Sequence, residues 1–247
     1  MKTKNLLQAV LFTMVMLLAS TGLSQEQETD NYQMTEITYI LPKIGMEVSF
    51  VNSMQEHFDL FHKDNLYQGH LDHILTSDEA GWYVWVMGQC MYTNIDTEAG
   101  DGNHNNHWTE RVVPFIDKYG RTEYWKFNKK LSYQTVETFS KYSNVWFVDV
   151  NRGMYNRFES FMIKINQAYK KRGDGNVQVY DNQFNAGDGR EICLIWGFSK
   201  WTELNDDADI KNSYEEIYGK GSWKKAMEEW RTITGTVVSQ AWEMGIE

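Results

Sequence analysis

Apolar residues along the 247-residue chain recur with two different spacings. Between residues 158 and 169 they follow one another at intervals of four, three and four, which places them on one face of an α-helix. The run 82–87 (WYVWVM) is instead apolar at consecutive positions, as is typical of a strand buried on both faces. The chain is therefore predicted to combine helices that cover a sheet with strands whose second face is covered as well.

The same patterns occur twice, in the same order, about 108 residues apart. A Gly-Met pair followed four residues later by Phe ends a β-prone run at 45–50 and again at 153–158. The segment WVMGQCMYTNID at 85–96 aligns with LIWGFSKWTELN at 194–205, with Gly and Thr at matching positions. A third block aligns Trp108 with a later Trp at an offset of about 115. Three blocks in order indicate a tandem duplication.

Each repeat is predicted to follow the order βαββαβ, the ferredoxin-like arrangement. A helix follows the first strand, a second helix runs through Trp108 and Tyr119 in the first copy, and a glycine is expected to end each second helix. The expected strands are 36–41, 67–75, 82–87 and one after Gly120 in the first repeat, and 145–150, 176–184, 192–196 and one after Gly235 in the second.

A βαββαβ unit whose sheet packs on a second copy resembles the dimeric α/β-barrel superfamily, which includes antibiotic-biosynthesis monooxygenase-like, EthD-like and NIPSNAP-like domains. The resemblance covers about 36–127 and 145–247, with 128–144 as a linker, and implies an α+β pseudo-dimeric barrel within one chain. It also implies a pocket between each sheet and its helices. Members use that pocket for cofactor-free oxidation, haem chemistry, isomerisation or binding alone, so the fold does not select the function.

The first 24 residues are read as a secretory signal peptide, with a basic start, an apolar run at 6–19 and small residues before a polar segment at 25–35. The protein is therefore expected to be exported to the periplasm or beyond and to have no membrane contact after cleavage. The net charge of −10 argues against nucleic acid as a partner. Cys90 and Cys193 each lie in or beside an apolar run, and the sequence leaves open whether they pair.

Histidine is distributed unevenly, because all six lie in the first repeat. His57 stands on the apolar stripe of the first helix, at the position that Ile165 holds in the second repeat, and this stripe faces the implied pocket. We take His57 as the candidate catalytic residue, with three possible roles: a general base, a haem ligand or a hydrogen-bond donor to a substrate. The alternative is a core histidine satisfied by one hydrogen bond. The other predicted ligand-binding residues are Tyr39, His73 and Trp85.

Two further groups of histidines were considered as metal ligands. The segment 104–108 (HNNHW) is expected to be a loop that enters a helix, and His104 and His107 are weak metal candidates because nothing nearby in the sequence completes a ligand set. In the segment HLDH, strand alternation puts His70 on one face with Asp72, which argues against a two-histidine metal site there.

Three classes of function follow. The leading one is the binding of a small, largely apolar molecule in the sheet–helix pocket of the first repeat, without a cofactor. The second is a cofactor-independent oxygenase or isomerase of the superfamily type. The third is a haem or divalent-metal protein that uses the histidines of the first repeat. The sequence leaves the oligomeric state open, and a monomeric pseudo-dimer is compatible with the duplication.

Overall fold

The computed structural model describes residues 33–63, 67–96, 102–134, 140–173, 175–185, 187–205 and 210–246. The signal peptide predicted at 1–24, and all but the last residues of the polar segment after it, lie outside this part of the chain. Within it, no helix is long and apolar enough to cross a membrane.

The first repeat has the predicted order of strands and helices, with extra short helical segments before its last strand. The elements are β1 (Met34–Pro42), α2 (Glu47–Phe61), β2 (Gly69–Ile74), β3 (Tyr83–Cys90), α3 (Tyr92–Ile95), α4 (Gly102–His107), the π-helical turn η1 (Trp108–Val112), the 3-10 turn η2 (Val113–Phe115) and β4 (Ile116–Phe127).

The second repeat has the same order and adds a short helix that the sequence did not indicate. A two-residue strand, which lies in the predicted linker, precedes the second repeat. The elements are β5 (Tyr133–Gln134), β6 (Tyr142–Val150), α5 (Tyr155–Arg172), β7 (Asn176–Asn182), β8 (Ile192–Phe198), the 3-10 turn η3 (Trp201–Asn205), α6 (Ile210–Tyr218), α7 (Ser222–Ile233) and β9 (Thr234–Glu243).

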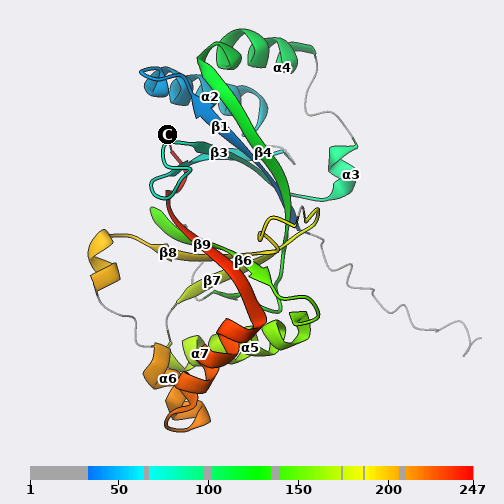
Figure 1. The fold of residues 1–247 in the computed structure, drawn as a ribbon. Helices are drawn as coiled ribbons and strands as arrows, with labels where there is room; N and C mark the ends of the chain where they lie inside the picture. The colour runs from blue at the N-terminus through cyan, green and yellow to red at the C-terminus, as the bar shows by residue number, and fades with distance from the viewer. Residues whose placement is uncertain are drawn as a thin grey trace, which may run out of the picture. The chain divides into compact units, whose positions relative to one another are not determined.

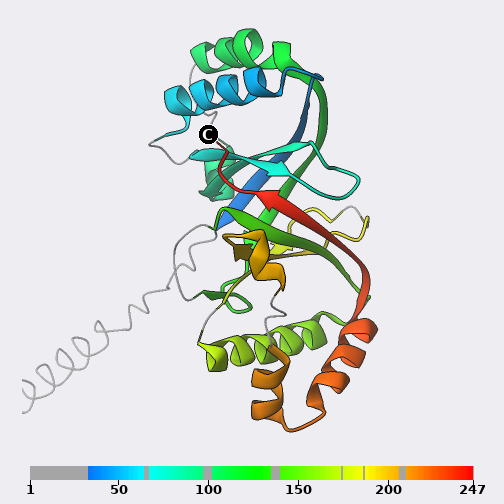
Figure 2. The same cartoon turned by 90° about the vertical axis from the view of Figure 1, so that its left-hand side faces the viewer.

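The strands of both repeats join in one antiparallel barrel. Their order is β4-β1-β3-β2-β9-β6-β8-β7-β5, and a further pairing of β4 with β7 closes the ring. The two seams between the repeats are β2–β9, where Ile74 pairs with Trp242, and β4–β7, where Phe127 pairs with Tyr180. Figures 1 and 2 show α2 and α4 over the outer face of the first sheet and α5, α6 and α7 over that of the second. The predicted pseudo-dimeric α/β barrel is confirmed.

Burial on both faces of β3 has a simple origin. Tyr83 packs with α2 residues such as Phe50, whereas Val84 and Val86 pack between the two sheets with side chains of the second repeat such as Phe147. An inter-sheet core thus lies between two helix-covered cores, one for each repeat.

Gly120 and Gly235 do not end helices, contrary to the prediction; they lie inside β4 and β9. The register shifts at both places: Thr38 pairs with Thr122 but Ile40 with Tyr119, and the pairing of β6 with β9 shifts in the same way near Gly235. Such a bulge needs a close approach of backbone, because a Cβ on Gly120 would lie 2.8 Å from the Cβ of Tyr39. The predicted second helix of the first repeat accordingly stops at η2, and Tyr119 belongs to β4.

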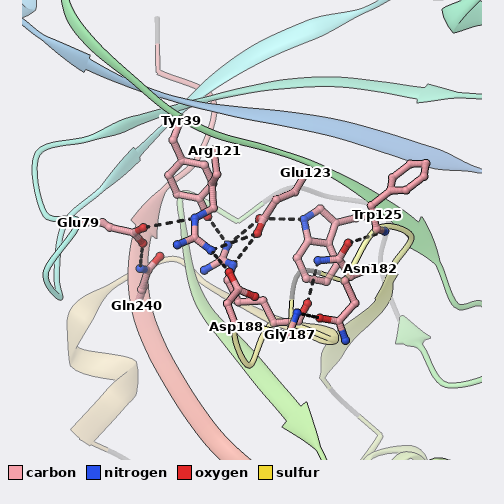
Figure 3. A network of polar contacts seen from close by, with 12 residues as sticks. Tyr39, Glu79, Arg121, Glu123, Trp125, Asn182, Gly187, Asp188 and Gln240 are labelled. Atoms are coloured by element: carbon pink, nitrogen blue, oxygen red, sulfur yellow. Dashed lines mark hydrogen bonds and ion pairs between the residues drawn. The ribbon is translucent and has the colours of Figure 1, made fainter.

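A buried ion pair ties the two repeats together beside the β4–β7 seam. Arg190, just before β8, donates from Nε to Glu123 Oε1 (2.7 Å) and from Nη2 to Glu123 Oε2 (2.8 Å) and to the Tyr39 hydroxyl (2.6 Å). Its guanidinium also stacks on the Phe147 ring, 3.3 Å from the centroid. Figure 3 shows the surrounding network, in which Arg121 reaches both Glu123 and Asp188. These contacts fix the register of one sheet against the other.

Candidate metal centre

Four of the six histidines meet under the two helices of the first repeat. Helix α2 and its last turn supply His57 and His62, and α4 supplies His104 and His107. One ring nitrogen from each of His57, His62 and His104 lies within 4.8 Å of the other two. His57 and His62 are 0% and 1% exposed, so this cluster is largely removed from solvent.

The protonation of His62 follows from its backbone partner. Its Nδ1 lies 2.8 Å from the carbonyl oxygen of Tyr67, which can only accept, so Nδ1 carries the hydrogen. The neutral ring then has a lone pair on Nε2. That Nε2 lies 3.1 Å from Nε2 of His104.

His104 is held in the same tautomer. Its Nδ1 lies 3.4 Å from the Asn105 side-chain oxygen, which is an acceptor, so the ring hydrogen belongs on Nδ1. The lone pairs of His62 and His104 therefore face each other without a hydrogen between them.

His57 is oriented by His107. The two Nδ1 atoms lie 3.2 Å apart, and His107 Nε2 lies 3.6 Å from a carboxylate oxygen of Glu56. The Glu56 contact is longer than a hydrogen bond, and His107 Nε2 has no hydrogen-bond partner among the described residues, but a hydrogen on it would face the carboxylate. In that tautomer His107 Nδ1 accepts from His57 Nδ1. His57 Nε2 then bears a lone pair; it is buried and has no hydrogen-bond partner among the residues that the structure describes.

Burial favours the neutral form of His57 and His62. Burial is the largest cause that lowers the pKa of His57, to about 3, and charge on His62, His104 and His107 would lower it further. Burial also lowers the pKa of His62, although its bond to the Tyr67 carbonyl acts in the opposite direction. Neutral imidazole is the form that binds a metal ion, so burial leaves His57 and His62 in the form that a metal ion requires.

Aromatic rings form the wall of the cluster. The Trp108 ring lies 5.2 Å from that of His57 and 5.0 Å from that of Trp85, measured between centroids. Phe61 meets the His104 ring edge-on at 5.2 Å. These rings pack against the imidazoles and limit their rotation.

The helix that carries His104 and His107 changes its winding directly after them. Trp108–Val112 form a π-helical turn, in which hydrogen bonds span one residue more than in an α-helix, and Val113–Phe115 follow as a 3-10 turn. Pro114 has no N–H and cannot continue a helical ladder. Turns of this kind are frequent at functional sites; here one keeps Val112 in the core while His107 stays against His57.

The structure brings together only some of the residues predicted to surround His57. The Trp85 ring lies 6.3 Å from that of His57, whereas His73 stacks on Tyr83 at 4.4 Å, on the same face of the sheet but apart from the cluster. Tyr39 lies on the opposite face, in the inter-sheet core, where its hydroxyl accepts from Arg190. The expected contact of Tyr39 with His57 is therefore wrong, because β1 presents Tyr39 to the barrel interior.

Segment 104–108 is helical rather than a loop, since α4 begins at Gly102. The neighbours that His104 and His107 lacked in the sequence come from the α2 region, 42 to 50 residues earlier: His62 lies beside His104 and His57 beside His107. Sequence reasoning missed His62 and this pairing. The available signal was the predicted topology itself, which lays both helices of one repeat on the same face of its sheet.

The second repeat has no such cluster at the equivalent place. Ile165 occupies the α5 position that corresponds to His57, and it is buried in the core of its own repeat. The two cysteines are free and buried, Cys90 in β3 and Cys193 in β8.

Comparison with known proteins supports the fold. No family model matches the chain, and no curated protein matches its sequence. Among solved structures, one from Lactobacillus acidophilus, provisionally assigned as a monooxygenase, superposes with a TM-score of 0.55 at 10% identity, covering 85% of this chain and 93% of that one.

Two further structures show the same likeness. An anthrone oxidase-like protein gives a TM-score of 0.52 at 10% identity over 87% of this chain and 92% of its own. A variant of chlorite dismutase from Candidatus Nitrospira defluvii gives 0.50 at 11% identity, covering 85% and 91%. At such identities these structures establish a shared fold, and the chemistry has to be argued from the residues of this chain.

Proposed function

On this dimeric α/β-barrel fold, we propose that the first repeat binds one divalent transition-metal ion, with Nε2 of His57, His62 and His104 as ligands. One observation carries the proposal: Nδ1 of each of the three rings has a hydrogen-bond partner, which leaves Nε2 of each ring for an ion, and one nitrogen from each ring lies within 4.8 Å of the other two. A ligating histidine commonly donates its other ring N–H in this way, which fixes the tautomer and aims the ring.

The distances suit a bare ion. Zinc binds imidazole nitrogen at about 2.0–2.1 Å, so two ligands of one tetrahedral ion lie about 3.3 Å apart. The His62 and His104 nitrogens are 3.1 Å apart, and the 4.8 Å limit for the set leaves only a small ring movement for the third ligand. Imidazole ligands suit Zn²⁺, Cu²⁺, Ni²⁺ and Fe²⁺, and exclude a preference for Ca²⁺ or Mg²⁺.

Haem suits these residues less well. Axial ligands of a haem iron bind from opposite faces, so their nitrogens lie about 4 Å apart with iron between them. His62 and His104 are too close for that arrangement and approach each other directly. The cluster therefore does not fit a haem with two histidine ligands, and the approach of a third ring nitrogen supports a bare ion.

A purely structural role explains the cluster poorly. A buried nitrogen without a hydrogen-bond partner costs about 1–3 kcal/mol, and His57 Nε2 is such an atom. Ile165 shows that an aliphatic side chain packs well at this position of the other repeat. A metal ion would satisfy all three nitrogens at once.

Three histidine ligands leave a coordination position for water or substrate, as in catalytic zinc sites. An ion held in this way supplies Lewis-acid chemistry and lowers the pKa of a bound water. His107, between His57 and Glu56, is placed to share a hydrogen bond with His57 Nδ1 and so to hold that ring in orientation. In this proposal, the small ligand that the sequence led us to expect near His57 would bind beside the ion.

The test is metal binding by full-length protein stripped with a chelator and titrated with Zn²⁺ and Co²⁺. We expect one ion per chain, with Co²⁺ giving the absorption of a low-coordinate nitrogen site. His62→Ala should abolish this binding, and His73→Ala, which lies outside the cluster, should leave it unchanged. Absence of stoichiometric binding, or equal binding by His62→Ala, would overturn the proposal.

We also propose that the protein is exported and works as a monomer. The support for export is the arrangement of residues 1–24, and the support for a monomer is that one chain already closes the barrel through both seams. Intact mass of the protein from its host and sedimentation of the purified form test the two points separately.

A further inference from the structure

A cavity of about 120 Å³ lies inside the barrel, between the two sheets. It is on the opposite face of β2 and β3 from the histidine cluster, since Val86 lines it while its neighbour Trp85 faces α2. Most of its wall is apolar, and both repeats contribute. The large side chains of the wall are Trp125, Phe147, Trp242 and Ile195.

One polar group in the wall is not satisfied. Asp72 is 1% exposed, and its Oδ1 accepts from the backbone N–H of Gly245 at 2.8 Å and lies 3.4 Å from His70 Nε2. Its Oδ2 is buried and has no hydrogen-bond partner within the described part of the chain. Buried carboxylate oxygens are almost always hydrogen-bonded, so an unpaired one in a cavity wall indicates a missing donor.

A neighbouring histidine lies against this carboxylate. Burial by itself lowers the pKa of His70, but the charge of Asp72 and their hydrogen bond outweigh burial and leave the pKa raised. A cationic ligand would therefore meet a pair that is neutral when His70 is protonated. Across the cavity, the Tyr180 hydroxyl donates to Gln178 Oε1 at 2.8 Å, so that its proton is used within the wall.

We infer that this cavity binds a small uncharged molecule, about the size of one six-membered ring, through a single hydroxyl group that donates to Asp72 Oδ2. An apolar protein cavity of about 150 Å³ accepts benzene, so the present volume suits a single ring and no larger body. The aromatic and aliphatic wall contacts the ring, and the carboxylate orients the hydroxyl.

The inference is independent of the proposed metal site. Strand alternation turns Asp72 inward and Leu71 toward α2, so neither site contributes a side chain to the other. A protein that lacks the metal ligands should still bind the ring compound, and failure of one site leaves the other standing.

Calorimetric titration of the purified full-length protein with phenol and cyclohexanol, and with toluene and benzylamine for comparison, tests the inference. We expect 1:1 binding of both hydroxyl compounds, with phenol at least about 10-fold tighter than toluene because a hydrogen bond to a charged acceptor is added. Fluorescence of the wall residues Trp125 and Trp242 should change at the same ligand concentrations. Absence of saturable binding, or a preference for benzylamine over phenol, would overturn the inference.

Three variants locate the site. Asp72→Asn keeps the size of the side chain but offers an amide donor at the Oδ2 position, so phenol should lose its advantage over toluene. Ile195→Phe and Val145→Phe each fill part of the cavity, and either substitution should abolish the binding of phenol and of toluene. Two such variants are used because one of them could disturb the packing of the core. Thermal unfolding identifies a variant whose packing is disturbed. Asp59→Asn, on the exposed side of α2, should bind phenol like the wild type. Unchanged phenol binding by Asp72→Asn, or by both filled variants, would refute the assignment.

Discussion

Nε2 of His62 lies 3.1 Å from Nε2 of His104, and the other nitrogen of each ring already faces an acceptor. Two lone pairs directed at each other repel unless a proton or a metal ion lies between them. Burial disfavours the proton, because it lowers the pKa of His62. The contact between these two residues therefore points to an ion.

His107 should tune metal affinity without ligating. It touches His57 through Nδ1 and does not belong to the converging set, so His107→Ala should weaken Zn²⁺ binding by about 10- to 100-fold, the usual effect of losing an outer partner of a ligand. Glu56→Gln should have a smaller effect in the same direction, since its contact is longer and half exposed. Competition titration against a chromophoric chelator measures the Zn²⁺ affinity of both variants. A complete loss of binding in His107→Ala would instead show that His107 is itself a ligand.

His57→Ile should separate fold from function. The second repeat packs Ile165 at this position, and the change removes a buried unpaired nitrogen. The free energy of unfolding of the metal-free variant should therefore equal that of the wild type or exceed it by up to about 1–3 kcal/mol. The same variant should lose stoichiometric Zn²⁺ binding. Denaturant titration with and without Zn²⁺ gives both quantities, and a strongly destabilised metal-free variant would show that His57 is a structural residue.

Acid should destabilise the metal-free protein through His57. An unfolded histidine has a pKa of about 6.5, and the folded value is about 3, so between these pH values the unfolded chain holds a proton that the folded chain lacks. The free energy of unfolding should thus fall by about 1.4 kcal/mol per pH unit from this residue as pH decreases from 6.5 toward 3, and the contribution is absent above that window. The difference between wild type and His57→Ile across this range isolates it; parallel pH profiles would contradict the shift.

Glu123→Ala should destabilise the barrel by about 3–5 kcal/mol, because it leaves the Arg190 guanidinium buried without its carboxylate. Arg121→Ala is the matched control. Arg121 contacts the same carboxylate at 3.5 Å but is 38% exposed, so its loss should cost no more than about 1 kcal/mol. Equilibrium unfolding of the two variants ranks them, and equal effects would show that the buried pair is not the main link between the sheets.

Gly120→Ala should cost about 1–3 kcal/mol, because the added Cβ would lie 2.8 Å from atoms of both Tyr39 and Trp82. Gly102→Ala, at the start of α4, has open space around the new methyl group and should be neutral or slightly stabilising. Thermal unfolding compares them directly. A neutral Gly120→Ala would mean that the bulge relaxes easily.

The fold was accessible from the sequence because each element carries its own periodicity and the duplication shows the order twice. The sequence could not show the register of the strands or the face of the sheet on which each side chain lies. The bulges at Gly120 and Gly235 made strand positions look like helix ends, since glycine serves both purposes. Whether Tyr39 faces the helices or the barrel interior depends on a shift of one residue, which no local pattern fixes.

The candidate site was only half accessible for the same reason. His57 was identifiable because a titratable side chain interrupts an apolar stripe. Its partners on α4 are close in space only through the packing of two helices, and the π-helical turn that aims them has no known sequence signal here. Single residues were thus predictable, and their convergence was not.

Closure of the barrel within one chain has an evolutionary consequence. In a barrel made of two identical chains, any substitution appears in both halves, so a mutation that suits one pocket is imposed on its twin. Fusion removes that coupling: one half can collect four histidines while the other keeps Ile165 and a solid core, and the shared seams hold the two together. The second repeat then acts as a scaffold that is free from the demands of the site, which lets this protein hold a buried polar cluster that a symmetric ancestor would have had to accommodate twice.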